Sequence, residues 1–201
     1  MPHPARLGPH SVLAAARALL EERGLAALTM RELARRLGVQ APSLYFHVRD
    51  RDALLSELID EGVRELGQRL DRAVKDSATT AGALLGMADA YCAFAGANPE
   101  LISLMFGPCP DGQSPGFDPG AGAAAPLFAT VSAAVPPADV APLAQAYWAL
   151  VHGFSMLANA GQFRLPGADP AIAMRRAVVA LLDGWGRAEA PPGVSQMGFH
   201  K

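Results

Sequence analysis

The chain has 201 residues, of which 51% are hydrophobic, and a formal net charge of −2. This length and apolar content are sufficient for one or two domains with a buried core. No uninterrupted apolar stretch reaches the roughly 18 residues of a membrane-spanning helix, and the first residues, MPHPARLGPH, lack the apolar segment of a signal peptide. We therefore expect a cytoplasmic protein with no membrane partner.

Positive charge is concentrated at the beginning of the chain. Residues 1–51 contain eight arginines and four acidic residues, a balance of 8 − 4 = +4, so the remainder carries −2 − 4 = −6. A basic head on an acidic body is typical of nucleic-acid-binding proteins, although a solvated basic face explains the same pattern equally well. The two cysteines, Cys92 and Cys109, match no metal spacing or disulfide framework, and we expect free thiols.

Two helices are expected first along the chain. Apolar residues follow the helical period over 9–23, and a second helix is expected at 30–37. Thr29 and Glu32 have the spacing of a capping box, in which hydroxyl and carboxylate each accept a hydrogen bond from a backbone N–H. Gly38 is suited to the left-handed conformation that ends a helix.

A third, short helix is expected at 42–47. It begins at Pro42, where a missing N–H does no harm, and turns Leu44 and Val48 inward. A six-residue helix is marginal alone in water, so its neighbours must hold it. The outward residues are expected to be Ser43, Tyr45, Phe46 and His47. Two short helices joined by a Gly-containing turn, with such an outer face, have the layout of a DNA-reading helix-turn-helix.

The remaining periodic segments also predict helices. Asp50 is a good N-cap for a helix that runs to about residue 73. Further helices are expected at 80–97, 99–106, 121–134, 138–161 and 170–187. Pro and Gly crowd the segment 107–120, which predicts a mobile loop, and no strand pattern is present.

The fold class is therefore predicted to be all-α. Residues 1–50 are expected to form a three-helix, helix-turn-helix DNA-binding domain, and residues 51–187 a larger helical domain for ligand binding and dimerisation. Residues 188–201 are expected to be a flexible tail.

The last two long helices have the features of an interface. The 138–161 helix is apolar on nearly every side and must be covered all round. The 170–187 helix carries small residues at spacings of four, three and four, which allow a second backbone to come close. These are Ala173, Ala177, Ala180 and Gly184. Burial within one chain is the simpler alternative, but we favour a symmetric four-helix interface between two copies.

The third-helix region also carries a family likeness. The run Leu44-Tyr45-Phe46-His47 follows Gly38-Val39 and precedes Arg49 and Arg51, within the segment LTMRELARRLGVQAPSLYFHVRDRDALL. Over about residues 9–58 this resembles the DNA-binding domain of tetracycline-repressor-like (TetR family) regulators. A weaker likeness, in AYWALVHGF, places Trp148, His152 and Gly153 in the pattern of a C-terminal subtype with a Trp-His-Gly motif. The family implies a homodimer joined through its last two long helices.

The resemblance also implies a set of DNA contacts. The positions carried over are Arg31, Ala41, Pro42, Ser43, Tyr45, Phe46, His47 and Arg51. Arg31 is expected to reach a guanine edge or a phosphate, with a solvated helix charge as the alternative. Ser43 is expected to meet base edges, or else to make a local backbone hydrogen bond.

The other positions have different chemistry. Tyr45 and His47 can donate to phosphates, and Arg51 adds charge at a helix start that already favours anions. Phe46 is suited either to a thymine methyl or to the edge of the core. Ala41 and Pro42 offer only apolar contact, so specificity must come from a few residues or from DNA shape.

A small-molecule site is expected among apolar residues of the body. Its candidate lining residues are Met87, Tyr91, Phe94, Met105, Phe106, Phe128, Trp148, His152 and Met156. Tyr91, His152 and Asn159 are the sparse polar contacts. Methionines and aromatics at helical spacing are also the ordinary composition of a packed core, so this alternative stays open.

These features predict a ligand-responsive transcriptional repressor that acts as a homodimer on a pseudo-palindromic double-stranded operator, with half-sites about 34 Å apart. A small, largely apolar effector would shift the helix after residue 50 and weaken DNA binding about 5- to 150-fold. No cofactor, no metal and no catalytic residues are expected. A helical-bundle enzyme is the alternative, but no HExxH or nucleophile beside a base is present. An architectural DNA-binding protein is disfavoured by the large apolar body.

Overall fold

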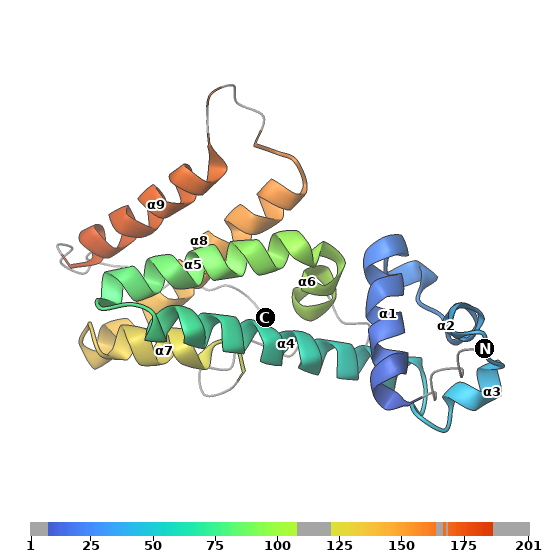
Figure 1. Ribbon diagram of the computed structural model, residues 1–201. Helices are drawn as coiled ribbons and strands as arrows, with labels where there is room; N and C mark the ends of the chain where they lie inside the picture. Colours follow the sequence, from blue (N-terminus) through green and yellow to red (C-terminus); the bar gives the residue numbers. More distant parts are fainter. Residues whose placement is uncertain (1–7, 108–121, 164–166, 168, 187–201) are drawn as a thin grey trace, which may run out of the picture.

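The computed structural model describes residues 8–107, 122–163, 167 and 169–186, and every regular element within them is a helix. The head comprises α1 (Pro9–Arg23), the 3-10 helix η1 (Leu25–Ala27), α2 (Met30–Leu37) and α3 (Ala41–Leu44). The body comprises α4 (Arg51–Lys75), α5 (Thr80–Ala97), α6 (Pro99–Phe106), α7 (Ala125–Ser132), α8 (Pro137–Asn159) and α9 (Pro170–Trp185). The head lies at one end, and α4 runs from it along the body (Figure 1). The prediction of an all-α fold is confirmed.

The head is held together by one leucine-rich core. Leu19 of α1, Leu33 of α2, Leu44 of α3 and Leu54 of α4 are each at most 1% exposed. Full burial of a leucine side chain contributes about 1.5–3 kcal/mol. Since α3 is too short to be stable alone, this shared core keeps it folded.

The predicted residues begin and end helix α2, but the predicted capping box at its start is incomplete. Thr29 Oγ1 accepts a hydrogen bond from Glu32 N at 3.2 Å, and Gly38 has the left-handed conformation at φ 68° and ψ 28°. The Glu32 carboxylate does not complete the capping box, because Arg23 and Arg35 donate to it. Thr29 N donates instead to the carbonyl of Ala27 at 2.9 Å. The capping prediction is right for the hydroxyl and wrong for the carboxylate.

Helix α3, the third helix of the sequence prediction, is shorter than expected. The expected helix covers 42–47, but the α-helix ends at Leu44 and residues 45–47 form turns. His47 N and Val48 N both donate to the Leu44 carbonyl, at 2.8 and 3.0 Å. The shorter of these spans three residues, which tightens the last turn and ends the helix.

Helix α4 is the element on which the body is built. Asp50 Oδ1 caps it by accepting from Ala53 N at 2.8 Å, and the helix continues two residues beyond the predicted end. Gly62 lets α6 approach closely: a Cβ there would lie 2.7 Å from Met105 Sδ, closer than packed atoms tolerate. Gly62 therefore leaves room on α4 for the Met105 and Leu101 side chains of α6.

The other helices lie where the sequence places them, with changes at their ends. The segment 121–134 contracts to the eight residues of α7, while α8 and α9 each end two residues earlier than expected. Apart from Gly107, the predicted mobile loop lies outside the described residues, as do Cys109 and the predicted tail at 188–201. Cys92 is a free thiol.

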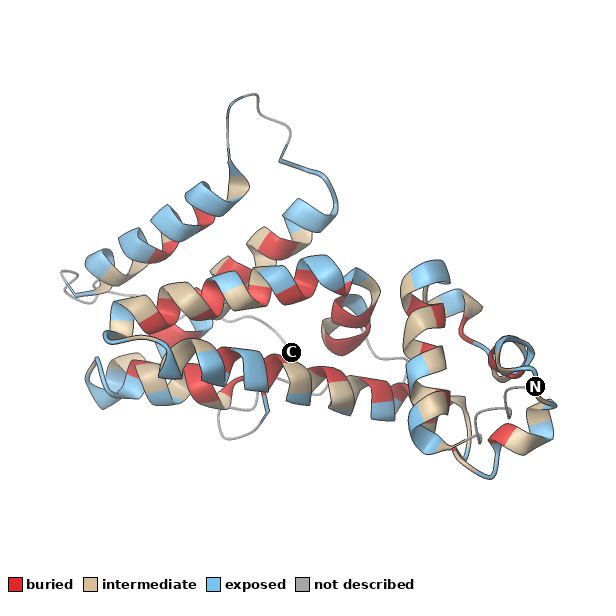
Figure 2. Cartoon of the chain, viewed as in Figure 1, coloured by how far each residue is buried: buried red, intermediate tan, exposed pale blue. Residues whose placement is uncertain are grey.

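Burial separates an inner body from an outer helix. Buried residues gather where α4, α5, α7 and α8 face one another, whereas α9 turns an exposed face away from the body (Figure 2). Helix α9 is attached through Met174 and Val178, which are 2% and 0% exposed. Among the described residues, no helix has the length and apolarity needed to cross a membrane.

Candidate DNA interface and sensor core

The end of the recognition helix presents an unusual exposed surface. Phe46 is 86% exposed and Tyr45 is 53% exposed, while Leu44 between them and the core is fully buried. Ser43 and His47 are half-buried beside them. Because an aromatic ring so far exposed contributes nothing to the core, the interpretation of Phe46 as a core-edge residue is wrong. The four predicted outer residues of this segment are all at least partly accessible, and the two aromatic ones are the most exposed.

The predicted arginine contacts differ in their surroundings. Arg31 is exposed on α2, and no ion pair to it is found among the described residues. Arg51 is partly buried, and its guanidinium donates to the carbonyls of Leu28 and Leu25 at 2.7 and 3.0 Å. Two of the N–H groups of Arg51 therefore join the start of α4 to the η1 segment that precedes α2. Ala41 is half-buried and Pro42 is exposed at the start of α3.

Acidic partners occupy several other arginines of the head. Arg36 makes a two-point ion pair with Glu22 at 2.6 and 2.7 Å, which joins α2 to α1. The hydrogen bonds from Arg35, followed by the charges of Arg35 and Arg23, lower the pKa of Glu32 to about 2. These exposed pairs align the short helices but are worth little stability individually, because water and salt screen them.

Four aromatic rings meet in the body, all from the predicted ligand-site residues. Trp148 stacks on His152 with ring centroids 5.5 Å apart, and Phe106 meets both rings edge-on at 5.0 and 5.3 Å. Tyr91 meets Trp148 edge-on at 5.3 Å. We call this group, Tyr91, Phe106, Trp148 and His152, the aromatic cluster. It joins α5, the end of α6, and α8.

One hydrogen bond gives the aromatic cluster its polarity. Tyr91 Oη lies 2.7 Å from His152 Nδ1. Burial raises the pKa of Tyr91, so its hydroxyl keeps its proton, and burial lowers the pKa of His152, which favours the neutral ring. In the tautomer that carries its proton on Nε2, Nδ1 accepts a hydrogen bond from the Tyr91 hydroxyl. A ligand with its own donor or acceptor can exchange with this pair.

The space beside the aromatic cluster is nearly closed. A cavity of about 10 Å³, lined by Met87, Tyr91, Trp148 and neighbours, lies between α4, α5, α7 and α8. That is room for about one water, far below the roughly 300–1,000 Å³ of ligand sites. Tyr147, an apolar residue of the 138–161 helix, also lines this cavity, together with four residues that no sequence pattern pointed to as site residues, which are Leu70, Ala123, Leu127 and Val151. As plain core residues, these carry no distinguishing sequence pattern.

The other predicted ligand-site residues do not join the aromatic cluster. Phe94 is fully buried below the Arg69 guanidinium, which lies 5.4 Å above its ring. Met105 is fully buried against α4, whereas Phe128 and Met156 are half-buried at the edge of the core. Asn159 holds the Ala95 carbonyl at 2.9 Å and lines a separate hollow of about 270 Å³ between α5, α8 and α9.

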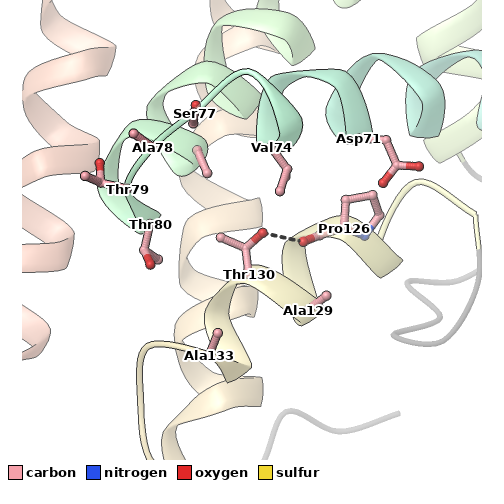
Figure 3. A pocket seen from close by; sticks show the side chains of 11 residues that line it. Asp71, Val74, Ser77, Ala78, Thr79, Thr80, Pro126, Ala129, Thr130 and Ala133 are labelled. Atoms are coloured by element: carbon pink, nitrogen blue, oxygen red, sulfur yellow. Dashed lines mark hydrogen bonds between the residues drawn. The ribbon is translucent and has the colours of Figure 1, made fainter.

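A larger groove of about 400 Å³ lies between the α4–α5 turn and α7 (Figure 3). Three of its hydroxyl groups are already engaged within the chain. Thr130 Oγ1 donates to the Pro126 carbonyl at 2.8 Å, Ser77 Oγ donates to the Ala73 carbonyl at 2.8 Å, and Thr79 Oγ1 accepts from Gly82 N at 3.0 Å. Among the described residues, no cluster of His, Cys, Asp and Glu is arranged to hold a metal ion.

Comparisons with known proteins agree with this architecture. Residues 12–58 match the family of bacterial regulatory proteins of the tetR type, and residues 84–181 match the tetracycline-repressor-like C-terminal domain. An uncharacterised HTH-type transcriptional regulator of Mycobacterium tuberculosis is 31% identical over 164 residues, which cover 79% of this chain and 73% of that protein. The chain belongs to the tetR family, as its resemblance implied. The finer Trp-His-Gly subtype stays a prediction.

Similarity to the tetracycline repressors themselves is concentrated in the head. The class A tetracycline repressor of Escherichia coli is 48% identical over 60 residues, which span 30% of this chain and only 28% of the repressor. A solved protein of unknown function from Rhodococcus sp. RHA1 has 30% identity and a TM-score of 0.79, covering 92% of this chain and 98% of that chain. A tetracycline repressor variant from Acinetobacter baumannii AYE, solved with minocycline, has 25% identity and a TM-score of 0.65, covering 90% and 98%.

The lowered pKa of His152 predicts a pH-dependent stability. Between the folded pKa and the ordinary value of 6.5, the unfolded chain binds a proton that the folded chain does not. The free energy of unfolding should therefore fall as the pH is lowered through about 6.5. We expect His152→Asn, which keeps a hydrogen-bond partner for Tyr91, to flatten this part of the curve in urea titrations. Equal slopes in wild type and His152→Asn would contradict this assignment.

Proposed function

We propose that the protein is a sequence-specific DNA-binding transcriptional regulator, most simply a repressor. The observation that carries the proposal is the surface formed by Ser43, Tyr45, Phe46 and His47, which is held outward by a fully buried Leu44. Residues 12–58, which contain this surface, match the tetR family, and the chain is 48% identical over 60 residues to the class A tetracycline repressor of Escherichia coli. A reading surface of aromatic and hydroxyl groups beside an arginine suits the edges and phosphates of the DNA major groove.

The roles of the contact residues follow from their surroundings. Tyr45 and His47 would donate to phosphates, and Phe46, the most exposed, would contact a thymine methyl. Arg31 and Ser43 would carry most of the direct readout, because Ala41 and Pro42 provide no hydrogen bonds. Arg51, whose guanidinium already holds two carbonyls, would act chiefly by fixing the head on α4.

Loss of the phosphate donors should weaken DNA binding. For Tyr45→Phe combined with His47→Ala, we expect about tenfold lower affinity for the DNA upstream of the protein's own coding region, since each hydrogen bond contributes about 0.5–1.5 kcal/mol. Arg31→Gln should also weaken binding to this duplex by about 1–3 kcal/mol and relax the base preference at the position that Arg31 reads. Fluorescence anisotropy with this duplex and with single-base variants of it measures both the affinity and the base preference.

Gln68→Ala, at an exposed position of α4 outside the head, is the matched control and should leave binding unchanged. An unrelated duplex of equal length distinguishes specific from non-specific binding. If wild type binds both duplexes equally, the proposal of a sequence-specific regulator fails.

A homodimer through α8 and α9 is the second part of the proposal. Ile172 and Val179 on α9 are 56% and 42% exposed, and Leu157 on α8 is 48% exposed. The small-residue stripe of α9 is not used inside the chain, since Ala173, Ala180 and Gly184 are exposed and Ala177 is only half-buried. Two copies of this face would bury apolar area and let the helices approach closely, and would set the spacing of the two heads.

A charge in this face should prevent the dimer. We expect wild type to sediment as a dimer and Val179→Asp as a monomer, because association would bury an unpaired carboxylate. Ala129→Asp is the control, since this exposed residue of α7 lies across the body from α9 (Figure 1). Sedimentation velocity decides the matter, and a dimeric Val179→Asp would rule out this interface.

The third part concerns the effector, for which the aromatic cluster is the proposed site. In the closed arrangement the rings pack on one another, and an apolar ligand with one polar group would have to displace them. Phe106 is the last residue of α6, and α6 packs on α4, which leads to the head. A displacement of the Phe106 ring would therefore be passed through α6 and α4 to the head.

Trp148 fluorescence can test this site, since the chain has only one other tryptophan. In a Trp185→Phe variant, we expect small aromatic compounds that lower DNA affinity to change the emission of Trp148, because they contact or displace its ring. The Trp148→Phe variant, which retains Trp185, is the matched control and should show no such change. A compound that releases DNA without altering Trp148 emission would exclude the cluster as its site.

A further inference from the structure

A glutamate of the head holds the beginning of a body helix. Glu21, on α1, accepts hydrogen bonds from Leu101 N at 2.9 Å and from Glu100 N at 3.2 Å. These amides belong to the first turn of α6, where N–H groups have no partner within the helix. A carboxylate at that position also favours the positive end of the helix dipole. The head thus supplies the cap that α6 lacks, because Asn98 makes no side-chain cap there.

Arg17, one turn earlier on α1, completes this junction. It donates to Asn98 Oδ1 at 2.8 Å and pairs with Glu65 of α4 at 2.7 Å. Asn98 is only 8% exposed, and its amide nitrogen donates to the Phe94 carbonyl at 2.9 Å. The two side chains of α1 therefore reach α4, the end of α5 and the start of α6 at one place.

The opposite end of α6 lies in the aromatic cluster. Phe106, its last residue, contacts both Trp148 and His152. Between the two ends, Leu101, Ile102 and Met105 are fully buried. Eight helical residues span about 12 Å, so α6 is a short, closely packed rod between the aromatic cluster and the head.

We propose that Arg17 and Glu21 are positioning residues that set the orientation of the DNA-reading head on the body and pass a displacement of α6 to it. The regulatory part of this inference rests on the proposed function, whereas the orienting part rests on the junction alone. Helix α4 is the covalent connection, and its first turn is packed into the head through Leu54 and held there by Arg51. The polar contacts from α1 provide a second attachment, which fixes the angle.

The neighbouring glutamate offers a matched control. Glu22 pairs with Arg36 of α2 and stays within the head. A substitution at 21 therefore removes contacts between head and body, whereas the same substitution at 22 removes a contact inside the head. Glu21→Gln is a milder variant, since its amide keeps one acceptor oxygen and loses the charge.

The experiment compares Glu21→Ala, Glu21→Gln and Glu22→Ala with wild type in the full-length protein. Hydrogen exchange should be about tenfold faster at the amides of Glu100 and Leu101 in Glu21→Ala, with a smaller increase in Glu21→Gln and none in Glu22→Ala. Residual dipolar couplings of α1–α3 should shrink relative to those of α5 and α8 in Glu21→Ala, because the head pivots. A purely structural role would lower global stability in urea and leave the native couplings unchanged.

DNA binding is measured on the same variants with the upstream duplex. We expect about fivefold to tenfold weaker binding by Glu21→Ala, because fewer molecules hold the head at the required angle. Exchange and couplings equal to wild type in Glu21→Ala would overturn the inference. If wild type itself does not bind the duplex, the proposed function fails, while exchange and couplings still decide whether the junction orients the head.

Discussion

A helix of four residues keeps its shape in this protein because its inner leucine is completely buried. Leu44 belongs to the same buried core as leucines of α1, α2 and α4, and this shared core allows the next residues to face outward. Tyr45 and Phe46 expose large ring surfaces that no isolated segment could present in a fixed arrangement. The DNA-reading surface is therefore a product of the whole head and not of its own short helix.

Charge in the head has two separate uses. Arg36 and Arg23 pair with glutamates across α1 and α2 and align these helices, while Arg17 reaches out of the head to α4 and to Asn98 before α6. Arg31 stays exposed on the surface of α2. Most arginines of the first 51 residues are thus engaged in contacts within the protein. The electrostatic attraction of the head to DNA therefore depends on the few arginines that remain accessible.

The packing of the body connects the aromatic cluster to the head through α6. Tyr91 and Trp148 of the aromatic cluster line a cavity of about 10 Å³, so a ligand that enters this cavity must displace side chains that line it. Phe106 belongs both to this cluster and to α6, whose other end is capped by Glu21 of the head. Close packing makes such a chain of contacts stiff, which is what transmission over several helices requires.

The sequence by itself determined the helices, the family and the inner and outer faces of the head. Periodicity, Gly38 and the capping residues Thr29 and Asp50 are local signals, and local signals survive without knowledge of the fold. Where the outcome depended on competition between partners, the local pattern failed. The capping role expected of Glu32 was lost to two arginines, and the recognition helix ended early when the Leu44 carbonyl accepted two N–H groups.

Only the tertiary structure decided which residues meet across long separations. The sequence separation between Glu21 and α6 carries no periodic signal, and neither does the distance in the chain from Tyr91 to His152. Methionines and aromatics at helical spacing predict burial, but not whether they enclose a space. Whether a cavity forms between the helices depends on how closely they pack. This packing depends on contacts between residues far apart in the sequence, such as those of Gly62 with Leu101 and Met105.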